Sequence, residues 1–138
     1  MYTPKHFQQH DWTRISELIR THPLATVIGT GEAGIFANHI PLLLRGGHEE
    51  SVTLQGHIAK ANEMTTRLQD GSEVLVIFQG VDGYISPGWY PSKQEDAKVV
   101  PTWNYIAVHI TGTIRFIHDR EWKADFLNSL TNLHESKM

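Results

Sequence analysis

The sequence predicts a mainly β domain with peripheral helices, of the α+β class, and two observations lead to that expectation. Five or more stretches of strand length carry alternating or continuous apolar residues and are separated by turn residues. Helical patterns occur near the two ends and in one central segment, and not between every pair of strands. This order favours an antiparallel sheet or barrel over a parallel sheet with crossover helices.

The first helix is expected to follow Asp11, whose side chain can cap its first turn, and to end at Pro23. Its apolar positions recur at helical spacing, at Trp12, Ile15, Leu18 and Ile19. We therefore interpret Trp12 as a core residue and not as a ligand contact.

Three strands are expected to follow this helix. Residues 24–30 and 35–45 are predicted as strands, joined by a turn at residues 31–34. Residues 46–50 read as a polar hairpin connection, and residues 52–58 alternate as a third strand.

The centre of the chain is predicted to contain a helix at residues 60–69, with Asn62 suited to cap it and Gly71 placed to stop it. Residues 74–78 form a continuous apolar run, typical of a strand that is buried on both faces. Residues 80–83 are expected to turn the chain.

The last third of the chain predicts a strand at residues 106–116 and then a helix that Asp119 can cap. The strand places polar residues on one face and apolar residues on the other, namely Ile106, Val108, Ile110, Ile114 and Phe116. The helix carries one core-facing stripe, formed by Trp122, Phe126, Leu130 and Leu133.

The composition excludes several classes of function. The chain has no Cys, which excludes disulfides, zinc–thiolate sites, iron–sulfur clusters and thiol nucleophiles. The net charge is -3 and the Lys and Arg residues are scattered, so the sequence does not support direct DNA binding. No apolar run approaches the ~20 residues that span a bilayer, and no signal peptide pattern is present, so we expect a cytoplasmic protein with no membrane partner.

Two motifs that suggest other ligands are better explained by structure. Residues 29–34 match G-x-G-x-x-G after a strand, but the residues that follow are β-branched and include Pro41, so a β-turn is favoured over a dinucleotide site. The nine His residues include neither an H-E-x-x-H nor an H-x-H pattern, so we expect no metal site.

The most informative stretch is residues 84–105, YISPGWYPSKQEDAKVVPTWNY, which concentrates two Trp, three Tyr and three Pro. Trp and Tyr combine a flat apolar face with a polar hydrogen, so a cluster of them can line a pocket and still direct hydrogen bonds. The prolines stiffen the backbone before any ligand arrives. A packed mini-core is the alternative, but the Ser, Lys, Thr and Asn residues among the rings favour a ligand wall.

Within this stretch, YISPGWYPSK and KVVPTWNY resemble the signature of the PaiB-type family of FMN-binding negative transcriptional regulators of bacteria. MYTPKHF at the start, ANHIPLLL at residues 37–44 and GHIAKAN at residues 56–62 resemble the same family in the same order. The resemblance implies an antiparallel split β-barrel of the FMN-binding type, formed by residues 1–138, and a homodimer with the flavin at its interface. Members of the family are longer, so we expect a C-terminal part of their domain to be missing here.

The resemblance also implies which residues hold FMN. The ring would be covered by Trp89, Tyr90 and Trp103. Neutral hydrogen bonds would come from Asn38, Ser86 and Asn104. The phosphate would be held by Lys60, Lys98, Thr102 and His57. The matching phrases add His39 and Asn62. No residue is assigned a catalytic role.

Three functions remain open at this point. The resemblance implies a regulator, and DNA is a partner only on that basis because no helix-turn-helix or basic arm is found. A flavin-dependent oxidoreductase using NAD(P)H is the alternative, because a flavin supplies redox chemistry without a catalytic dyad. A flavin carrier is the third.

Overall fold

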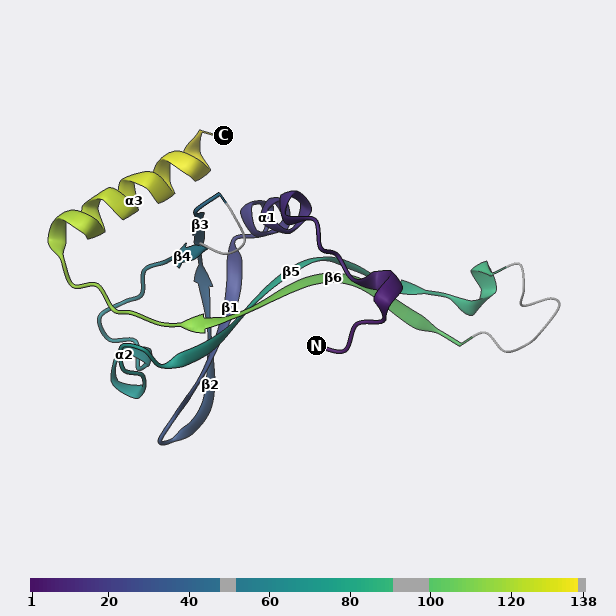
Figure 1. Ribbon diagram of the computed structural model, residues 1–138, viewed down its shortest axis with the longest axis horizontal. Helices are drawn as coiled ribbons and strands as arrows, with labels where there is room; N and C mark the ends of the chain where they lie inside the picture. Colours follow the sequence, from purple (N-terminus) through teal and green to yellow (C-terminus); the bar gives the residue numbers. More distant parts are fainter. Residues whose placement is uncertain (48–51, 91–99, 137–138) are drawn as a thin grey trace.

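The computed structural model describes residues 1–47, 52–90 and 100–136, and they form a mixed α and β structure (Figure 1). The helices are α1 (Trp12–Thr21), α2 (Met64–Arg67) and α3 (Arg120–Glu135), with short 3-10 turns at η1 (Lys5–Phe7) and η3 (Pro87–Trp89). The strands are β1 (Leu24–Gly31), β2 (Gly34–Pro41), β3 (Leu43–Arg45), β4 (Thr53–Gln55), β5 (Glu73–Ile85) and β6 (Thr102–Thr113). The α+β class is therefore confirmed.

All strand pairs are antiparallel, as predicted, and they form two sheets. Four strands pair in the order β2-β1-β5-β6, and β3 pairs with β4 in a separate two-stranded sheet. The larger sheet stays open in this single chain, with β2 and β6 at its two edges.

The core lies on one face of the larger sheet. Val74, Val76 and Phe78 alternate along β5 and are buried, whereas Leu75 and Ile77 are half-buried, so the VLVIF run forms a strand as predicted but is not buried on both faces. Ile19 of α1 and Met64 of α2 pack against the same cluster and are fully buried. The side chains between them on β5 point to the other face and are half-buried or exposed.

The first helix forms where the sequence predicted it. The Asp11 carboxylate accepts a hydrogen bond from the Thr13 backbone N–H at 2.9 Å, which caps the first turn. Trp12, expected in the core, is instead half-buried, and its indole N–H donates to the Gly47 carbonyl at 3.2 Å.

The prediction of a single strand at residues 35–45 is wrong, because β2 ends at Pro41 and β3 begins at Leu43. The Leu42 N–H donates to the Pro23 carbonyl at 2.9 Å, which continues the register of the β1–β2 ladder by one pair. Pro23 has no N–H to donate in return, so the ladder ends there. The chain then continues as β3 in the smaller sheet. The expected strand at residues 52–58 is also shorter and covers only Thr53–Gln55. The next residue, Gly56, packs closely, since an added Cβ would lie 2.5 Å from Leu42 Cδ2.

The helix expected at residues 60–69 is only the four-residue α2. The Asn62 side chain does accept a hydrogen bond from the Met64 N–H at 2.9 Å. Leu68 is extended and buried, so core packing ends the helix early. Gly71 has φ +88 and lies in the turn before β5, where its N–H donates to the Ile114 carbonyl at 2.8 Å.

The glycine-rich motif at residues 29–34 forms the β1–β2 hairpin, which confirms the β-turn and excludes the dinucleotide interpretation. Gly34 opens β2 with φ +98, a conformation that L residues rarely adopt. At Gly31 an added Cβ would lie 2.7 Å from the Arg67 carbonyl oxygen. The glycines therefore serve the turn and close packing.

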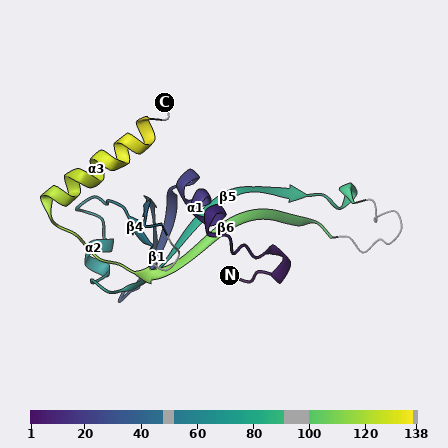
Figure 2. The ribbon, with the colours of Figure 1, turned by 45° about the horizontal axis from the view of Figure 1, so that its top comes forward.

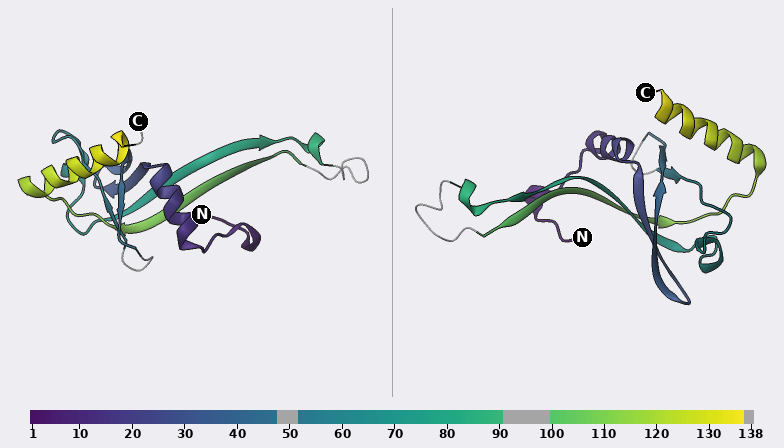
Figure 3. Two further views of the ribbon diagram at one scale, coloured as in Figure 1. Left: turned by 90° about the horizontal axis from the view of Figure 1, so that it is seen from above. Right: turned by 180° about the vertical axis from the view of Figure 1, so that it is seen from behind.

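Beyond Gln79, β5 continues without β1 and forms a two-stranded arm with β6 that projects from the body (Figures 2 and 3). The turn expected at residues 80–83 is therefore wrong, since the chain stays extended through a register shift between Gln79 and Asp82. Gly80 has a packing role here, because an added Cβ would lie 2.8 Å from Leu18 Cδ1. β6 also begins earlier than predicted, with Val108 and Ile110 against the core.

α3 begins as predicted, with the Asp119 carboxylate accepting from the Trp122 N–H at 2.7 Å. Phe126 is buried, whereas Leu130 and Leu133 are half-buried, so the predicted stripe reaches the core at one residue. In the part of the chain that is described, no helix is long and apolar enough to cross a membrane.

Replacing Gly31 with Ala tests the close packing of the β1–β2 hairpin. We expect Gly31→Ala to lower the free energy of unfolding by about 1–3 kcal/mol, because the new methyl group would push against backbone that cannot rotate away. Urea denaturation measures the effect. Gly83→Ala is the matched control, since nothing lies within 4 Å of its added Cβ. Equal stability of the two variants would contradict the packing argument.

Candidate functional site

The outer half of the arm carries an exposed aromatic surface. Trp103 of β6 lies opposite Tyr84 of β5, with ring centroids 6.1 Å apart. The Trp103 indole N–H donates to an Asp82 carboxylate oxygen at 2.9 Å. Both rings remain about half exposed, 55% for Trp103 and 49% for Tyr84. Large apolar surfaces that stay exposed in this way commonly mark binding sites.

The turn η3 extends this surface toward the end of the arm. The Ser86 hydroxyl accepts a hydrogen bond from the Gly88 N–H at 3.2 Å and caps the turn. Trp89 and Tyr90 follow and are exposed, Trp89 to 68%. Ser86 therefore has a local structural role, and the two rings face solvent.

The predicted contacts of β6 lie on two faces of the arm. Trp103 shares one face with Tyr84 and Asp82, whereas Thr102 and Asn104 point to the opposite face because strand side chains alternate. Lys98, expected to hold the phosphate, lies outside the described residues. A flat ligand stacked on Trp103 would not reach the side chain of Asn104 of the same chain.

The remaining predicted contacts belong to the body. The Asn62 side-chain amide donates to Asn38 Oδ1 at 3.1 Å, which joins β2 to the segment before α2. His39 points to the other face of the sheet, where its Nδ1 lies 3.2 Å from Thr26 Oγ1. His57 lies against Phe126 of α3, with ring centroids 5.8 Å apart, and Lys60 is exposed.

The structure thus separates the predicted site residues into two groups. The arm carries the aromatic group, and β2 with the segment before α2 carries the polar group, toward the opposite end of the molecule (Figure 1). Among the body residues, Asn38 and Asn62 are joined by a hydrogen bond. Residues 79–90 and 100–107 of the arm contain no Lys, Arg or His.

Two residues that the sequence analysis did not select stand out in the structure. Asp82, which we placed in a turn, fixes the indole of Trp103. Arg67 lies with its guanidinium carbon 4.5 Å from the Phe36 ring centroid, and its Nε is buried without a hydrogen-bond partner. The alternation of Asp82 and Tyr84 with Val81 and Gly83 could have indicated a strand with Asp82 and Tyr84 on one face. No sequence signal indicated the role of Arg67.

The described side chains are suited to bind part of a flavin. The exposed rings of the arm suit an isoalloxazine, and the body offers amide groups and the Lys60 ammonium. FMN requires contacts for its ring, hydrogen bonds for its polar edge and a cation for its phosphate. Residues 79–90 and 100–107 of the arm contain no cation, so the described surface of the arm does not meet all three requirements. The described residues contain no cluster of His, Cys, Asp and Glu that could hold a metal ion.

Comparison with known proteins identifies the family. Residues 1–138 match the family described as "Putative FMN-binding domain". The chain belongs to this FMN-binding family. FMN is accordingly its cofactor.

Three relatives show how widely the family occurs. The chain is 34% identical to the uncharacterized protein YKL070W of Saccharomyces cerevisiae, covering 99% of this chain and 92% of that protein. It is 32% identical to the protease synthase and sporulation protein PAI 2 of Bacillus subtilis, covering 88% of this chain and 56% of that protein. It is 31% identical to the uncharacterized protein AN0679 of Emericella nidulans, covering 76% and 52%. The chain therefore spans about half the length of two of these relatives, and the PaiB resemblance is confirmed.

Proposed function

We propose that the protein holds FMN between two copies of the chain, with the body of one copy and the arm of the other forming each site. The separation of the aromatic arm from the polar body residues carries this proposal. A homodimer joins the two groups without any change in the fold of either chain. In a C2 dimer the same exchange occurs twice, so both sites are complete.

Exposed apolar residues support the same arrangement. Val81 and Ile106 on the arm are 71% and 52% exposed, and Ile35 on the uncovered face of the sheet is 76% exposed. A stable protein interface usually buries about 1,200–2,000 Å² in total. The arm and the uncovered sheet face together offer a surface of that kind, and pairing there would close the open sheet toward a split barrel.

The proposed roles of the individual residues follow from their chemistry. Trp103, Trp89 and Tyr90 of the arm would cover the flavin ring. Asn38 and Asn62 of the other copy would hydrogen-bond its polar edge or the ribityl chain, and Lys60 would pair with the phosphate. His39, His57, Ser86, Lys98, Thr102 and Asn104 remain candidates for further contacts. The flavin would supply the redox chemistry of any reaction.

We propose a regulatory role for this flavin-binding dimer, exerted through a protein partner. The name of the Bacillus subtilis relative refers to protease synthesis and sporulation, and the resemblance to the PaiB type implies negative regulation. The net charge of -3 and the scattered Lys and Arg residues argue against direct binding to DNA phosphates. A flavin oxidoreductase and a carrier are the outcomes that the assays below distinguish.

Replacing Trp103 with Ala tests whether its indole contacts the flavin ring. We expect Trp103→Ala to raise the FMN dissociation constant about tenfold or more, because losing one aromatic stacking partner costs about 1–3 kcal/mol. Quenching of FMN fluorescence on titration with protein measures the constant. Trp12→Ala is the matched control, since that indole bonds to the Gly47 carbonyl and is not one of the proposed flavin contacts. An unchanged constant for Trp103→Ala would remove the arm from the site.

Mixing two variants tests whether the arm acts on the other copy. Trp103→Ala and Lys60→Ala should each bind FMN weakly alone. After unfolding, mixing in equal amounts and refolding together, about a quarter of all sites should regain native affinity, because half the dimers are mixed and each has one intact site. Fluorescence titration counts these sites. No recovery, with dimers present by light scattering, would place the whole site within one chain.

Activity assays separate regulation from redox catalysis. We expect the FMN-loaded protein to oxidise NADH and NADPH no faster than free FMN at equal concentration, and to show no salt-sensitive binding to duplex DNA. Absorbance at the nicotinamide band and fluorescence anisotropy are the measurements. Turnover above the free-flavin rate would instead assign an oxidoreductase.

A further inference from the structure

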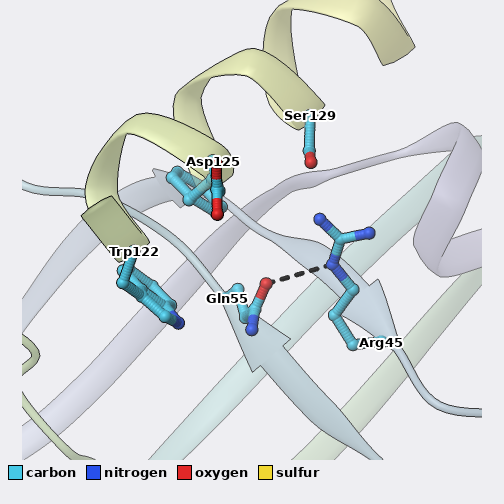
Figure 4. Close-up of a pocket in the computed structure, with 6 residues that line it drawn as sticks. Arg45, Gln55, Trp122, Asp125 and Ser129 are labelled. Atoms are coloured by element: carbon cyan, nitrogen blue, oxygen red, sulfur yellow. Dashed lines mark hydrogen bonds between the residues drawn. The ribbon is translucent and has the colours of Figure 1, made fainter.

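A groove lies beneath α3, between that helix and strands β3 and β4 (Figure 4). Its volume is about 260 Å³, and its lining comprises Arg45, Gln55, Trp122, Asp125, Phe126 and Ser129. A second cavity of about 150 Å³ shares Arg45 and Ser129 with it and continues along Arg20, Pro23, Leu42, Leu43, Leu44 and Leu133. The groove thus has a polar part and an adjoining part whose lining is mostly apolar and includes Arg20.

Phe126 holds α3 over this groove. It is 3% exposed and contacts His57, with ring centroids 5.8 Å apart. Within the helix it stacks on Trp122, with ring centroids 5.6 Å apart and planes inclined by 5°. Leu133, two turns farther along, is only half-buried. The helix is therefore anchored at Phe126, and residues from Trp122 to Leu133 line the space beneath it.

The polar part presents opposite charges from two different elements. Arg45 Nε donates to Gln55 Oε1 at 3.0 Å, which orients the guanidinium toward the groove. Figure 4 shows the Asp125 carboxylate and the Ser129 hydroxyl entering the same space from α3. Among the described residues, neither Arg45 nor Asp125 has an ion-pair partner within 4.0 Å.

We propose that this groove binds a free apolar α-amino acid. The carboxylate would pair with the terminal nitrogens of Arg45 and accept from Ser129, and the ammonium would pair with Asp125. The side chain would enter the cavity lined by Leu42–Leu44 and Leu133. Drug-sized ligands occupy about 300–1,000 Å³, so a cavity of 260 Å³ suits a small metabolite.

The charge pattern selects this class over simpler ligands. A phosphate would meet Arg45 but place its additional negative charge beside Asp125, and a diamine would place positive charge beside Arg45. A zwitterion satisfies both groups at once. None of the six lining residues belongs to the proposed flavin site, so this proposal stands or falls independently of that one.

Ligand-observed NMR with L-leucine tests the proposal. We expect a dissociation constant of about 1 mM or below, a range suited to a partly exposed site for so small a ligand. Glycine should bind at least tenfold more weakly, because it leaves the leucine-lined cavity empty. Saturation transfer that is absent for leucine at about 10 mM would overturn the proposal.

Two variants assign the two charged contacts. Arg45→Gln should weaken leucine binding about tenfold or more, and so should Asp125→Asn. Asp125→Asn should leave the affinity for 4-methylpentanoate, which lacks the ammonium, unchanged within about twofold. Arg120→Gln, an exposed change on the same helix outside the groove, serves as the control. Leucine affinity that is unaltered in both Arg45→Gln and Asp125→Asn would overturn the proposed site.

Discussion

The backbone pairing of β5 with β6 is the interaction on which the rest of the structure depends. The first half of β5 pairs with β1 and carries buried core residues, whereas its second half has β6 as its strand partner. Isolated two-stranded ribbons are marginally stable in water. The arm therefore relies on its continuity with the sheet, on Leu18 packed at Gly80, and on the bond from Trp103 to Asp82.

This pairing also decides where the aromatic residues can act. Strands rise about 3.3 Å per residue, so the six steps from Gln79 to Ile85 carry the end of the arm about 20 Å beyond the body. The same ladder that stabilises the arm keeps Trp103 extended and away from Asn38 and Asn62 of its own chain. A site that uses both groups therefore follows most simply from two copies, as proposed above.

Sequence reasoning predicted the elements whose signals are local. Asp11 and Asp119 cap helices where expected, and the VLVIF run forms a strand, because capping and strand patterns depend on neighbouring residues. It failed where a distant contact decides the outcome. The β1–β2 ladder ends where Leu42 meets Pro23, which has no N–H, so one predicted strand becomes two. Gly80, which we placed in a turn, instead accommodates Leu18 of α1.

The position of α3 is another feature that sequence reasoning could not predict, and it affects where a ligand can bind. Helical spacing predicted that Trp122, Phe126, Leu130 and Leu133 all face the core, and a stripe of this sort fixes the face of a helix but not its depth. Closing the groove would bury Arg45 beside the helix, and the desolvation of such a charge is offset only by a well-formed pair. Asp125 lines the same groove but lies beyond ion-pair distance, so α3 docks through Phe126 and leaves the polar part of the groove accessible to a ligand that carries both charges.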